Sequence, residues 1–431
     1  MQQAEIEQQS QYPKWRGYYV FILLFLIFMF DYVDRMVIVS LFPFLKSDWG
    51  LTDAQCGLLV SALFWSMVVF VVPIGAVVDR WSRKNTIGLM AIIWGLATGA
   101  ATITRNFTQL IITRCVVGLG EAAYAPAGLA FISAIFKPGI RARMAGIWYA
   151  AVPLGQALGI VIGGIIAVHL GWRNAFGIVA IPGLIVAILF FWVKDYKTVD
   201  LLKSASKEET AAKIKMSKLD VVRELFRSKS LVLNNLAIAA AAFSGVAFTT
   251  WMPAYFQRFE GMSIERSGMM TSVIMLLAII GAPLGGFLTD KWMKKQSNAR
   301  MLFPAISCAI TAILIFTALQ FHGTLQFGFL MAFGLTIIMY TAGGFSVTQD
   351  VIHPGLRSTS YSINVIFQHL LGSALGPLVV GALSDVYGLD KALSIVPIVT
   401  FLAAMLFFIG SFFYKKDVDN TEKVQIVFEN K

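Results

Sequence analysis

Long apolar runs separated by short polar segments dominate the chain, and this pattern predicts helices that cross a membrane. Each run has about 20 residues or more, the length that a helix needs to span a bilayer. The first run follows sixteen polar residues and is too long for a cleaved signal peptide. Twelve runs are predicted, at about 17–41, 54–78, 86–104, 107–135, 142–168, 172–193, 232–256, 267–289, 300–320, 325–349, 359–384 and 392–414.

A polar segment rich in Lys and Glu, 194–231, divides these runs into two groups of six. We therefore expect an N-terminal six-helix bundle at 1–193, a cytoplasmic linker at 194–231, and a C-terminal six-helix bundle with a cytoplasmic tail at 232–431. Two interpretations of the linker stay open, an amphipathic helix on the membrane surface or a solvated tether. The predicted fold class is an all-α polytopic membrane protein with twelve transmembrane helices.

Composition supports this class and excludes others. Of the 431 residues, 57% are hydrophobic and only 14% are charged, whereas soluble domains are about 25% charged. A cytosolic enzyme, a nucleic-acid-binding module and a disordered protein are therefore excluded. The sequence has no phosphate-binding Gly-Lys-Ser/Thr loop and no His, Cys and carboxylate set with metal-ligand spacing. We therefore expect that the protein binds no cofactor and no metal and that it is not an enzyme.

The net charge of +11 follows from the topology. If the N-terminus is cytoplasmic, 27 of the 35 Lys and Arg residues fall on the cytoplasmic side and six on the opposite side. Cytoplasmic loops of membrane proteins carry this excess, so both termini are predicted to be cytoplasmic. The basic residues then indicate contact with anionic membrane lipid and no nucleic-acid partner. We expect a multi-pass protein of the bacterial inner membrane that functions as a monomer.

A charged loop occurs twice at matching positions in the two groups of runs. Gly75–Lys84 and Gly286–Lys295 both follow the pattern G-x-x-x-D-[RK]-W-x-[RK]-K, 211 residues apart. A repeat at matched positions indicates two related, pseudo-symmetric halves, an architecture known among transporters.

The loop at 75–84 resembles the cytoplasmic signature loop of the major facilitator superfamily. The resemblance implies two six-helix bundles around a central cavity that opens alternately to either side of the membrane. It also implies a conformational latch, in which Asp79 pairs with Arg143 or with the start of the eleventh span, and Asp290 acts likewise in the second half. The latch residues implied are Gly75, Asp79, Arg80, Arg83, Arg143 and Asp290.

Ionisable residues inside the membrane are costly and are functional candidates by default. Five occur in the first half and none in the second, where only His369 lies within a span. Asp31 and Arg35 are four residues apart on one helix, a favourable spacing for pairing, and Arg114 and Glu121 share a helix face. A buried arginine offers a planar fork to a carboxylate or sulfonate, and a neighbouring carboxyl group can exchange a proton. The five are Asp31, Asp34, Arg35, Arg114 and Glu121.

Two local sequences narrow the resemblance. Phe30–Arg35 resembles the N-Y-x-D-R signature of the anion:cation symporters and spinster-like transporters, and Arg114–Tyr124 resembles their R-x-x-x-G-x-G-E-A motif. By resemblance, Arg35 and Arg114 contact the anion or hold the carboxylates, and Asp34 and Glu121 carry protons. Asp31 departs from the signature, which has Asn there, and adds a possible third proton-coupling acid.

The second half is expected to supply neutral polar contacts to the substrate. Asn364 and Gln368, like Trp251 and Tyr255, are four residues apart and therefore share a helix face. The full set of candidate substrate-binding residues is Arg35, Arg114, Tyr124, Tyr149, Gln156, Trp251, Tyr255, Tyr340, Asn364, Gln368 and His369.

These features predict a secondary active transporter that couples protons to a small organic anion, a carboxylate or sulfonate. One alternative is a spinster-like exporter of lysolipids or other amphiphiles. Another is a receptor or channel that does not transport by alternating access. A purely structural role of the buried charges, as an ion-pair network that fixes helix packing, is the remaining alternative.

Overall fold

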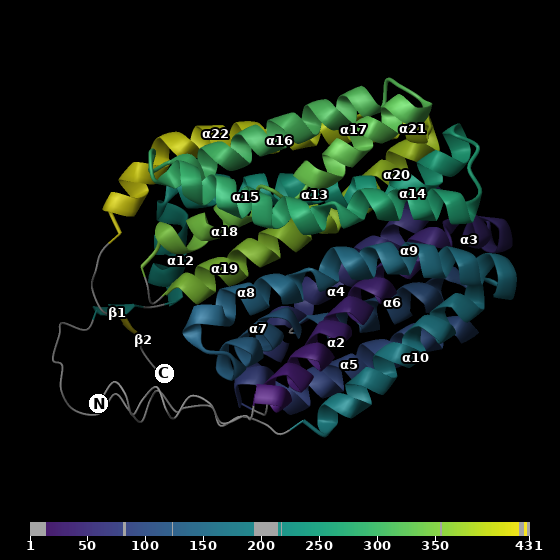
Figure 1. The fold of residues 1–431 in the computed structure, drawn as a ribbon, viewed down its shortest axis with the longest axis horizontal. Helices are drawn as coiled ribbons and strands as arrows, with labels where there is room; N and C mark the ends of the chain where they lie inside the picture. Colours follow the sequence, from purple (N-terminus) through teal and green to yellow (C-terminus); the bar gives the residue numbers. More distant parts are fainter. Residues whose placement is uncertain are drawn as a thin grey trace.

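The chain folds almost entirely into helices in the computed structural model (Figure 1). The structure describes residues 14–80, 83–122, 124–193, 214–216, 218–353, 356–421 and 426–428. Among these, ten helical stretches are long and apolar enough to cross a membrane. The other two predicted spans, at 17–41 and 107–135, are helical except for the turn residues Leu41 and Ala122 among those described, so the predicted helical membrane fold is confirmed.

The N-terminal half contains nine α-helices and one 3₁₀ helix among the described residues. Each predicted span corresponds to one helix or to two consecutive helices. In chain order they are α2 (Lys14–Ser40), α3 (Phe42–Trp49), α4 (Asp53–Arg80), α5 (Arg83–Ala100), η1 (Ala101–Ile103), α6 (Phe107–Glu121), α7 (Tyr124–Ile135), α8 (Pro138–Tyr149), α9 (Ala151–Leu170) and α10 (Trp172–Phe191).

The C-terminal half is built in the same way, with one unusual turn. Gln368–Ser373 forms a π-helix, η3, in the middle of the predicted eleventh span. The other elements are β1 (Ile214–Met216), α12 (Lys218–Arg227), α13 (Lys229–Phe259), α14 (Ile264–Leu276), α15 (Ala278–Met293), α16 (Ala299–Ala318), α17 (Gly323–Thr336), α18 (Thr341–Asp350), α19 (Arg357–Phe367), α20 (Leu375–Tyr387), α21 (Leu389–Leu393), α22 (Ile395–Asp419) and β2 (Ile426–Phe428).

Polar residues mark several helix starts. The side chain of Asn106 accepts a hydrogen bond from the backbone N–H of Gln109 at the start of α6. Ser228 and Ser263 do the same at the starts of α13 and α14. These bonds satisfy backbone donors that would otherwise lack a partner, and they fix where each helix begins after a loop.

The described part of the linker agrees in part with the expected helix. Lys218–Arg227 is helical, but Ile214–Met216 is a strand that pairs in parallel with Ile426–Phe428 near the C-terminus. Nothing in the sequence pattern predicts this strand pair. Residues 194–213 of the linker lie outside the described part of the chain.

The two halves lie side by side, with α2–α10 in one bundle and α13–α22 in the other (Figure 1). Contacts between the bundles run mainly through α4 with α20 and through α9 with α14. The end of α20, which bonds to Asp53 through Ser384, and the start of α14, which bonds to Gln257 next to Arg258, lie at the end of the molecule that holds Asp53, opposite the start of α2 and the end of α22 (Figure 1). We call this end the Asp53 end. The bundles are therefore joined chiefly at the Asp53 end.

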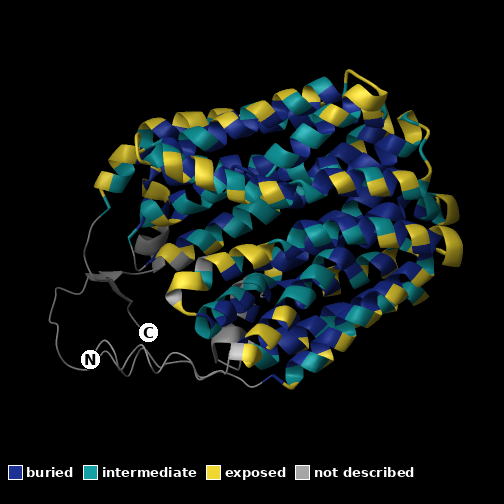
Figure 2. Cartoon of the chain, viewed as in Figure 1, coloured by how far each residue is buried: buried dark blue, intermediate teal, exposed yellow. Residues whose placement is uncertain are grey.

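Exposed residues lie along the outer faces of the helices (Figure 2), and many of them are large and apolar. On α10, for example, Ile178, Ile181, Ile185 and Ile188 are 40–56% exposed and recur at helical spacing. An exposed stripe of this kind suits contact with lipid chains and would be unfavourable in water.

Glycines allow two pairs of helices to approach closely. A Cβ atom added at Gly155 of α9 would lie 2.3 Å from the carbonyl oxygen of Met29 in α2. A Cβ atom added at Gly57 of α4 would lie 2.3 Å from the carbonyl oxygen of Pro377 in α20. Small residues at such crossings are typical of membrane helix packing. The first crossing holds the N-terminal bundle together, and the second joins the two bundles.

The α2–α9 crossing generates a stability prediction. Gly155→Ala should lower the free energy of unfolding by about 1–3 kcal/mol, because backbone must move to admit the methyl group. The measurement is the apparent melting temperature of the purified protein in detergent. Gly328→Ala in α17 is the matched control, since nothing lies within 4 Å of its added Cβ atom, and it should keep or raise that temperature. Equal melting temperatures for the two variants would contradict the prediction.

Candidate functional site

Arg35 is the centre of a charge cluster buried in the N-terminal bundle. Its guanidinium donates to Asp31 through Nε and NH2, at 3.2 and 2.9 Å. The same Nε lies 2.9 Å from Oε2 of Glu121, which belongs to α6. The exposed fractions of Arg35, Asp31 and Glu121 are 6%, 1% and 2%. One buried guanidinium therefore holds two carboxyl groups from two helices.

Aromatic rings cover the faces of this guanidinium. The Arg35 Cζ atom lies 4.4 Å from the ring centre of Tyr32 and 6.0 Å from that of Phe64. Phe64 in turn stacks on His369 of η3, with ring centres 5.4 Å apart. The C-terminal half thus reaches the charge cluster through His369, with Phe64 of the N-terminal half in between. Nδ1 of His369 is buried and has no hydrogen-bond partner.

A second pair of charges, Asp34 and Arg114, lies beside the first group. Both are almost fully buried, with exposed fractions of 2% and 1%. Thr98 of α5 donates to Oδ2 of Asp34 at 3.2 Å, whereas Oδ1 has no partner. Arg114 reaches only the backbone oxygen of Asp34, through two contacts of 3.4 Å, and its Nε has no partner. These partly satisfied groups are capable of forming new bonds.

Charge balance within the cluster is incomplete. Three carboxyl groups and two guanidinium groups are buried together, which leaves one negative charge uncompensated if all five are ionised. An uncompensated charge in a low-dielectric interior is very costly, and such groups neutralise instead. A single proton shared among the carboxyl groups would make the cluster neutral. The arrangement is therefore suited to binding and releasing protons.

Tyr124 is placed near this cluster but already has a partner. Its hydroxyl donates to the carbonyl oxygen of Leu24 at 2.6 Å, and Nε1 of Trp148 donates to the same oxygen at 3.1 Å. Both rings pack around Phe28, which stacks on Trp148 with centres 4.1 Å apart. In this conformation Tyr124 ties α7 to α2.

Between the bundles, Tyr149 of α8 and Tyr361 of α19 interact with one another. Tyr149 is 41% exposed, and Tyr361 and Gln156 are half-buried. Tyr149 and Gln156 come from the N-terminal half, and Tyr361 comes from the C-terminal half. They are accessible to a substrate in the present conformation.

Other second-half candidates are divided between the interface and the interior of their own bundle. Asn364 donates to Asn235 of α13 at 2.8 Å and keeps its buried Oδ1 unpartnered. Gln368 is half-buried at the start of the π-helix.

The remaining three candidates do not join the charge cluster. Trp251 is fully buried and donates to the carbonyl oxygen of Pro377 at 3.0 Å. Tyr255 accepts from Gln326 at 3.1 Å, and Tyr340 packs against Phe407. All three lie in helix packing.

The structure describes only some of the side chains of the latch that the family resemblance implies. The side chains of Gly75, Asp79, Arg80 and Arg83 lie outside the described part of the structure. Arg143 and Asp290 are described, and both are exposed.

Several residues near the cluster were missed by the sequence analysis. Thr98, Tyr32 and Phe64 contact the charged groups directly. Tyr32 stands at the Tyr of the N-Y-x-D-R signature but was given no role, and nothing in the local sequence singled out Thr98 or Phe64. Among the described residues, no group of three or more His, Cys, Asp or Glu is placed to hold a metal ion.

Comparison with known proteins identifies the family. Residues 24–377 match the model of the Major Facilitator Superfamily. The chain is 27% identical to the hexuronate transporter of Bacillus subtilis, covering 86% of this chain and 88% of that protein. It is 26% identical to the protein spinster of Drosophila melanogaster, covering 83% of this chain and 60% of that protein.

A solved structure agrees with this result. A bacterial homologue of the human lysosomal transporter spinster, in an inward-facing and unoccupied conformation, superimposes with a TM-score of 0.80 at 22% identity. The alignment covers 94% of this chain and 99% of the other, and it shows the shared fold. The chain is thus a membrane transporter, not an enzyme, and it belongs to the major facilitator superfamily.

Proposed function

We propose that this protein is a secondary transporter that couples protons to a small organic anion, a carboxylate or a sulfonate. The observation that carries the proposal is the buried cluster in which three carboxyl groups share two guanidinium groups. A cluster with one acid in excess can bind or release one proton while all of its groups stay inside the membrane. A structural ion-pair network would need no such excess.

Competition for Arg35 provides the coupling. When Glu121 takes up a proton, its attraction to Arg35 falls, and one side of the guanidinium is free for a substrate carboxylate. When Glu121 releases the proton, its carboxylate again competes for Arg35 and weakens substrate binding. Asp34, whose Oδ1 is unpartnered, offers a second position for the proton next to Arg114.

The arrangement of the two bundles supports an order of events. The bundles are joined chiefly at the Asp53 end and less closely at the opposite end, where α2 begins and α22 ends. We assign that side to the cytoplasm of a bacterial cell, in line with the excess of Lys and Arg there. The structure then corresponds to the inward-facing state. Proton and anion enter from the opposite side and leave here, through a monomer in the inner membrane.

Neutral groups of both halves complete the substrate site in this proposal. Tyr149 and Gln156 act from the N-terminal bundle, and Asn364, Gln368 and His369 act from the C-terminal bundle. His369 is set against Phe64, whose other neighbour is Arg35. An anion bound to Arg35 would therefore affect both bundles, the N-terminal one directly and the C-terminal one through Phe64 and His369. In this proposal these contacts link substrate binding to the movement of the bundles.

A second candidate function is export of lysolipids or other amphiphiles. Aromatic side chains beside Arg35 favour it, since Tyr32 and Phe64 would suit an apolar chain that follows an anionic headgroup. The similarity to spinster proteins is almost as high as that to the hexuronate transporter. Uptake by proteoliposomes of a panel of carboxylates, sulfonates and lysolipids, with and without an inward proton gradient, separates the two candidates. Gradient-driven accumulation of a small anion supports the first, and transport of lysolipids alone supports the second.

Removing the exchangeable proton at Glu121 is the direct test of coupling. Glu121→Gln should abolish accumulation driven by a proton gradient, because the amide binds no proton in this pH range. Counterflow exchange of the same substrate should persist, because it needs no net proton movement. Glu224→Gln in α12 makes the same chemical change at an exposed ion pair with Arg227, and it should accumulate normally. If Glu121→Gln accumulates substrate as the native protein does, Glu121 has no coupling role.

Asp31, the departure from the family signature, generates a prediction about stoichiometry. Asp31→Asn balances the cluster at two carboxyl groups and two guanidinium groups, so that one proton per monovalent anion is sufficient. If all three carboxyl groups are ionised in the empty native site, two protons are released with each anion, and uptake should rise with an inside-negative membrane potential. Uptake by Asp31→Asn should not respond to that potential. The readout is initial uptake at set potassium diffusion potentials, and an equal response of both proteins would overturn the prediction.

A further inference from the structure

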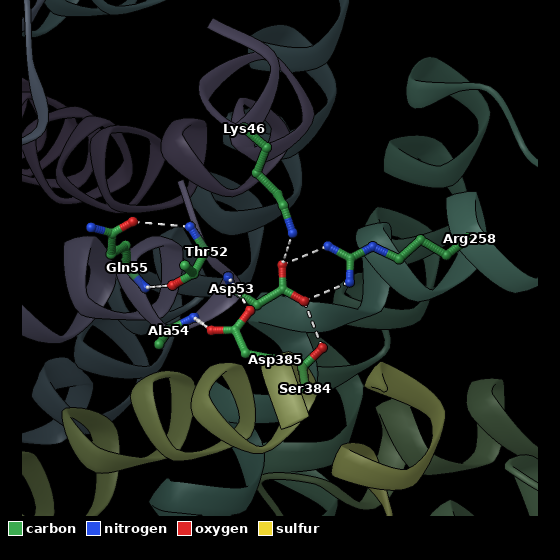
Figure 3. Close-up of polar contacts among 8 residues, drawn as sticks. All are labelled: Lys46, Thr52, Asp53, Ala54, Gln55, Arg258, Ser384 and Asp385. Atoms are coloured by element: carbon green, nitrogen blue, oxygen red, sulfur yellow. Dashed lines mark hydrogen bonds and ion pairs between the residues drawn. The ribbon is translucent and has the colours of Figure 1, made fainter. Parts of the chain in front are cut away.

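A second buried acid, Asp53, lies far from the charge cluster, at the start of α4. Its carboxylate is 3% exposed and accepts four side-chain donors (Figure 3). Arg258 binds it with both terminal nitrogens, at 2.6 and 2.7 Å. Lys46 Nζ and Ser384 Oγ each donate at 2.5 Å. A carboxylate with a bidentate guanidinium and two further donors is among the strongest polar arrangements in proteins.

A neighbouring acid reinforces the same junction. Asp385 of α20 accepts from the backbone N–H groups of Asp53 and Ala54, both at 2.8 Å. Free N–H groups and the helix dipole make the start of a helix favourable for an acid. In most helices such an acid belongs to residues next to the helix in sequence, but here it comes from the other bundle (Figure 3).

Every strong contact of this group except one crosses between the bundles. Lys46 and Asp53 belong to the N-terminal bundle, whereas Arg258, Ser384 and Asp385 belong to the ends of α13 and α20 in the C-terminal bundle. The Asp53 backbone also packs tightly on Gly381 of α20, where an added Cβ atom would lie 2.4 Å from the Asp53 carbonyl oxygen. We call these five polar residues the Asp53 clasp.

We propose that the Asp53 clasp is a gate, whose bonds must break before the Asp53 end can open, and whose strength sets the ratio of the two conformations. Separation of the bundles removes three of the four donors from the carboxylate and removes the cap from α4. Water can reach the Asp53 carboxylate and replace these donors only when the Asp53 end is open. The clasp therefore stabilises the arrangement seen here over the one open at the Asp53 end. This proposal is independent of substrate identity and of proton coupling.

The chain offers a matched control at the same end. Asp48 accepts from Trp172 Nε1 at 2.8 Å and from Arg173 at 3.3 Å. It lies in α3, and both partners lie in α10 of the same bundle. Asp48→Asn thus removes an equal charge from an ion pair at this end, without touching the junction between the bundles.

The test measures the opening of the Asp53 end directly. Spin labels are attached to Arg105→Cys and Lys391→Cys, which are exposed positions at this end in the two bundles, in a chain carrying Cys115→Ala. Distances between the labels are recorded by pulsed electron resonance in lipid nanodiscs, without substrate and without a proton gradient. Because neither is present, the result does not depend on the proposed coupling.

With Asp53→Asn, the ratio of the long-distance to the short-distance population should rise by about tenfold, the change expected for losing charge-assisted bonds. Asp48→Asn should leave the ratio as in the native protein. Arg258→Gln should shift it in the same direction as Asp53→Asn, which keeps the proposal testable if one variant fails to fold. An unchanged ratio in a folded Asp53→Asn or Arg258→Gln protein, or an equal shift with Asp48→Asn, would overturn the proposal.

Discussion

The need to pair charges inside a membrane governs the N-terminal bundle. Arg35 can remain at membrane depth because Asp31 of its own helix and Glu121 of α6 surround it. Asp34, one residue before it, is held by Thr98 of α5. Three helices are thereby fixed relative to one another by groups that have no alternative partner in lipid. The same requirement makes the bundle sensitive to the gain or loss of one proton.

Charge is handled differently at the two levels of the molecule. In the middle, the acids outnumber the guanidinium groups and several of their atoms lack partners. At the Asp53 end, one buried carboxylate accepts several strong hydrogen bonds, and breaking them would cost free energy. In the proposed mechanism the first arrangement exchanges protons and ligands, and the second stabilises one conformation. A transporter needs both, since substrate binding must be reversible while opening must be limited to one side at a time.

The sequence predicted what depends on local order along the chain. Apolar runs located the spans, and the spacing of Asp31 and Arg35 correctly predicted their pairing, because residues four apart meet on one helix. Contacts between distant segments could not be predicted in this way. The cap that Asp385 places on α4 joins residues more than 330 positions apart. Helical spacing also put Trp251 and Tyr255 on one face without showing their partners, since Trp251 donates to Pro377 and packs on Phe42 of α3, whereas Tyr255 accepts from Gln326.

The contrast between the two halves limits where substrate choice can be made. The chain is 27% identical to a hexuronate transporter and 26% identical to a spinster protein, so similarity alone does not choose between a small anion and an amphiphile. Arg35 and its acids would serve either, because both substrates carry an anionic group. Discrimination must then come from groups that touch the rest of the molecule. In the proposed transport site these groups are Gln368 and His369 of the π-helix, since His369 stacks on Phe64, which neighbours Arg35.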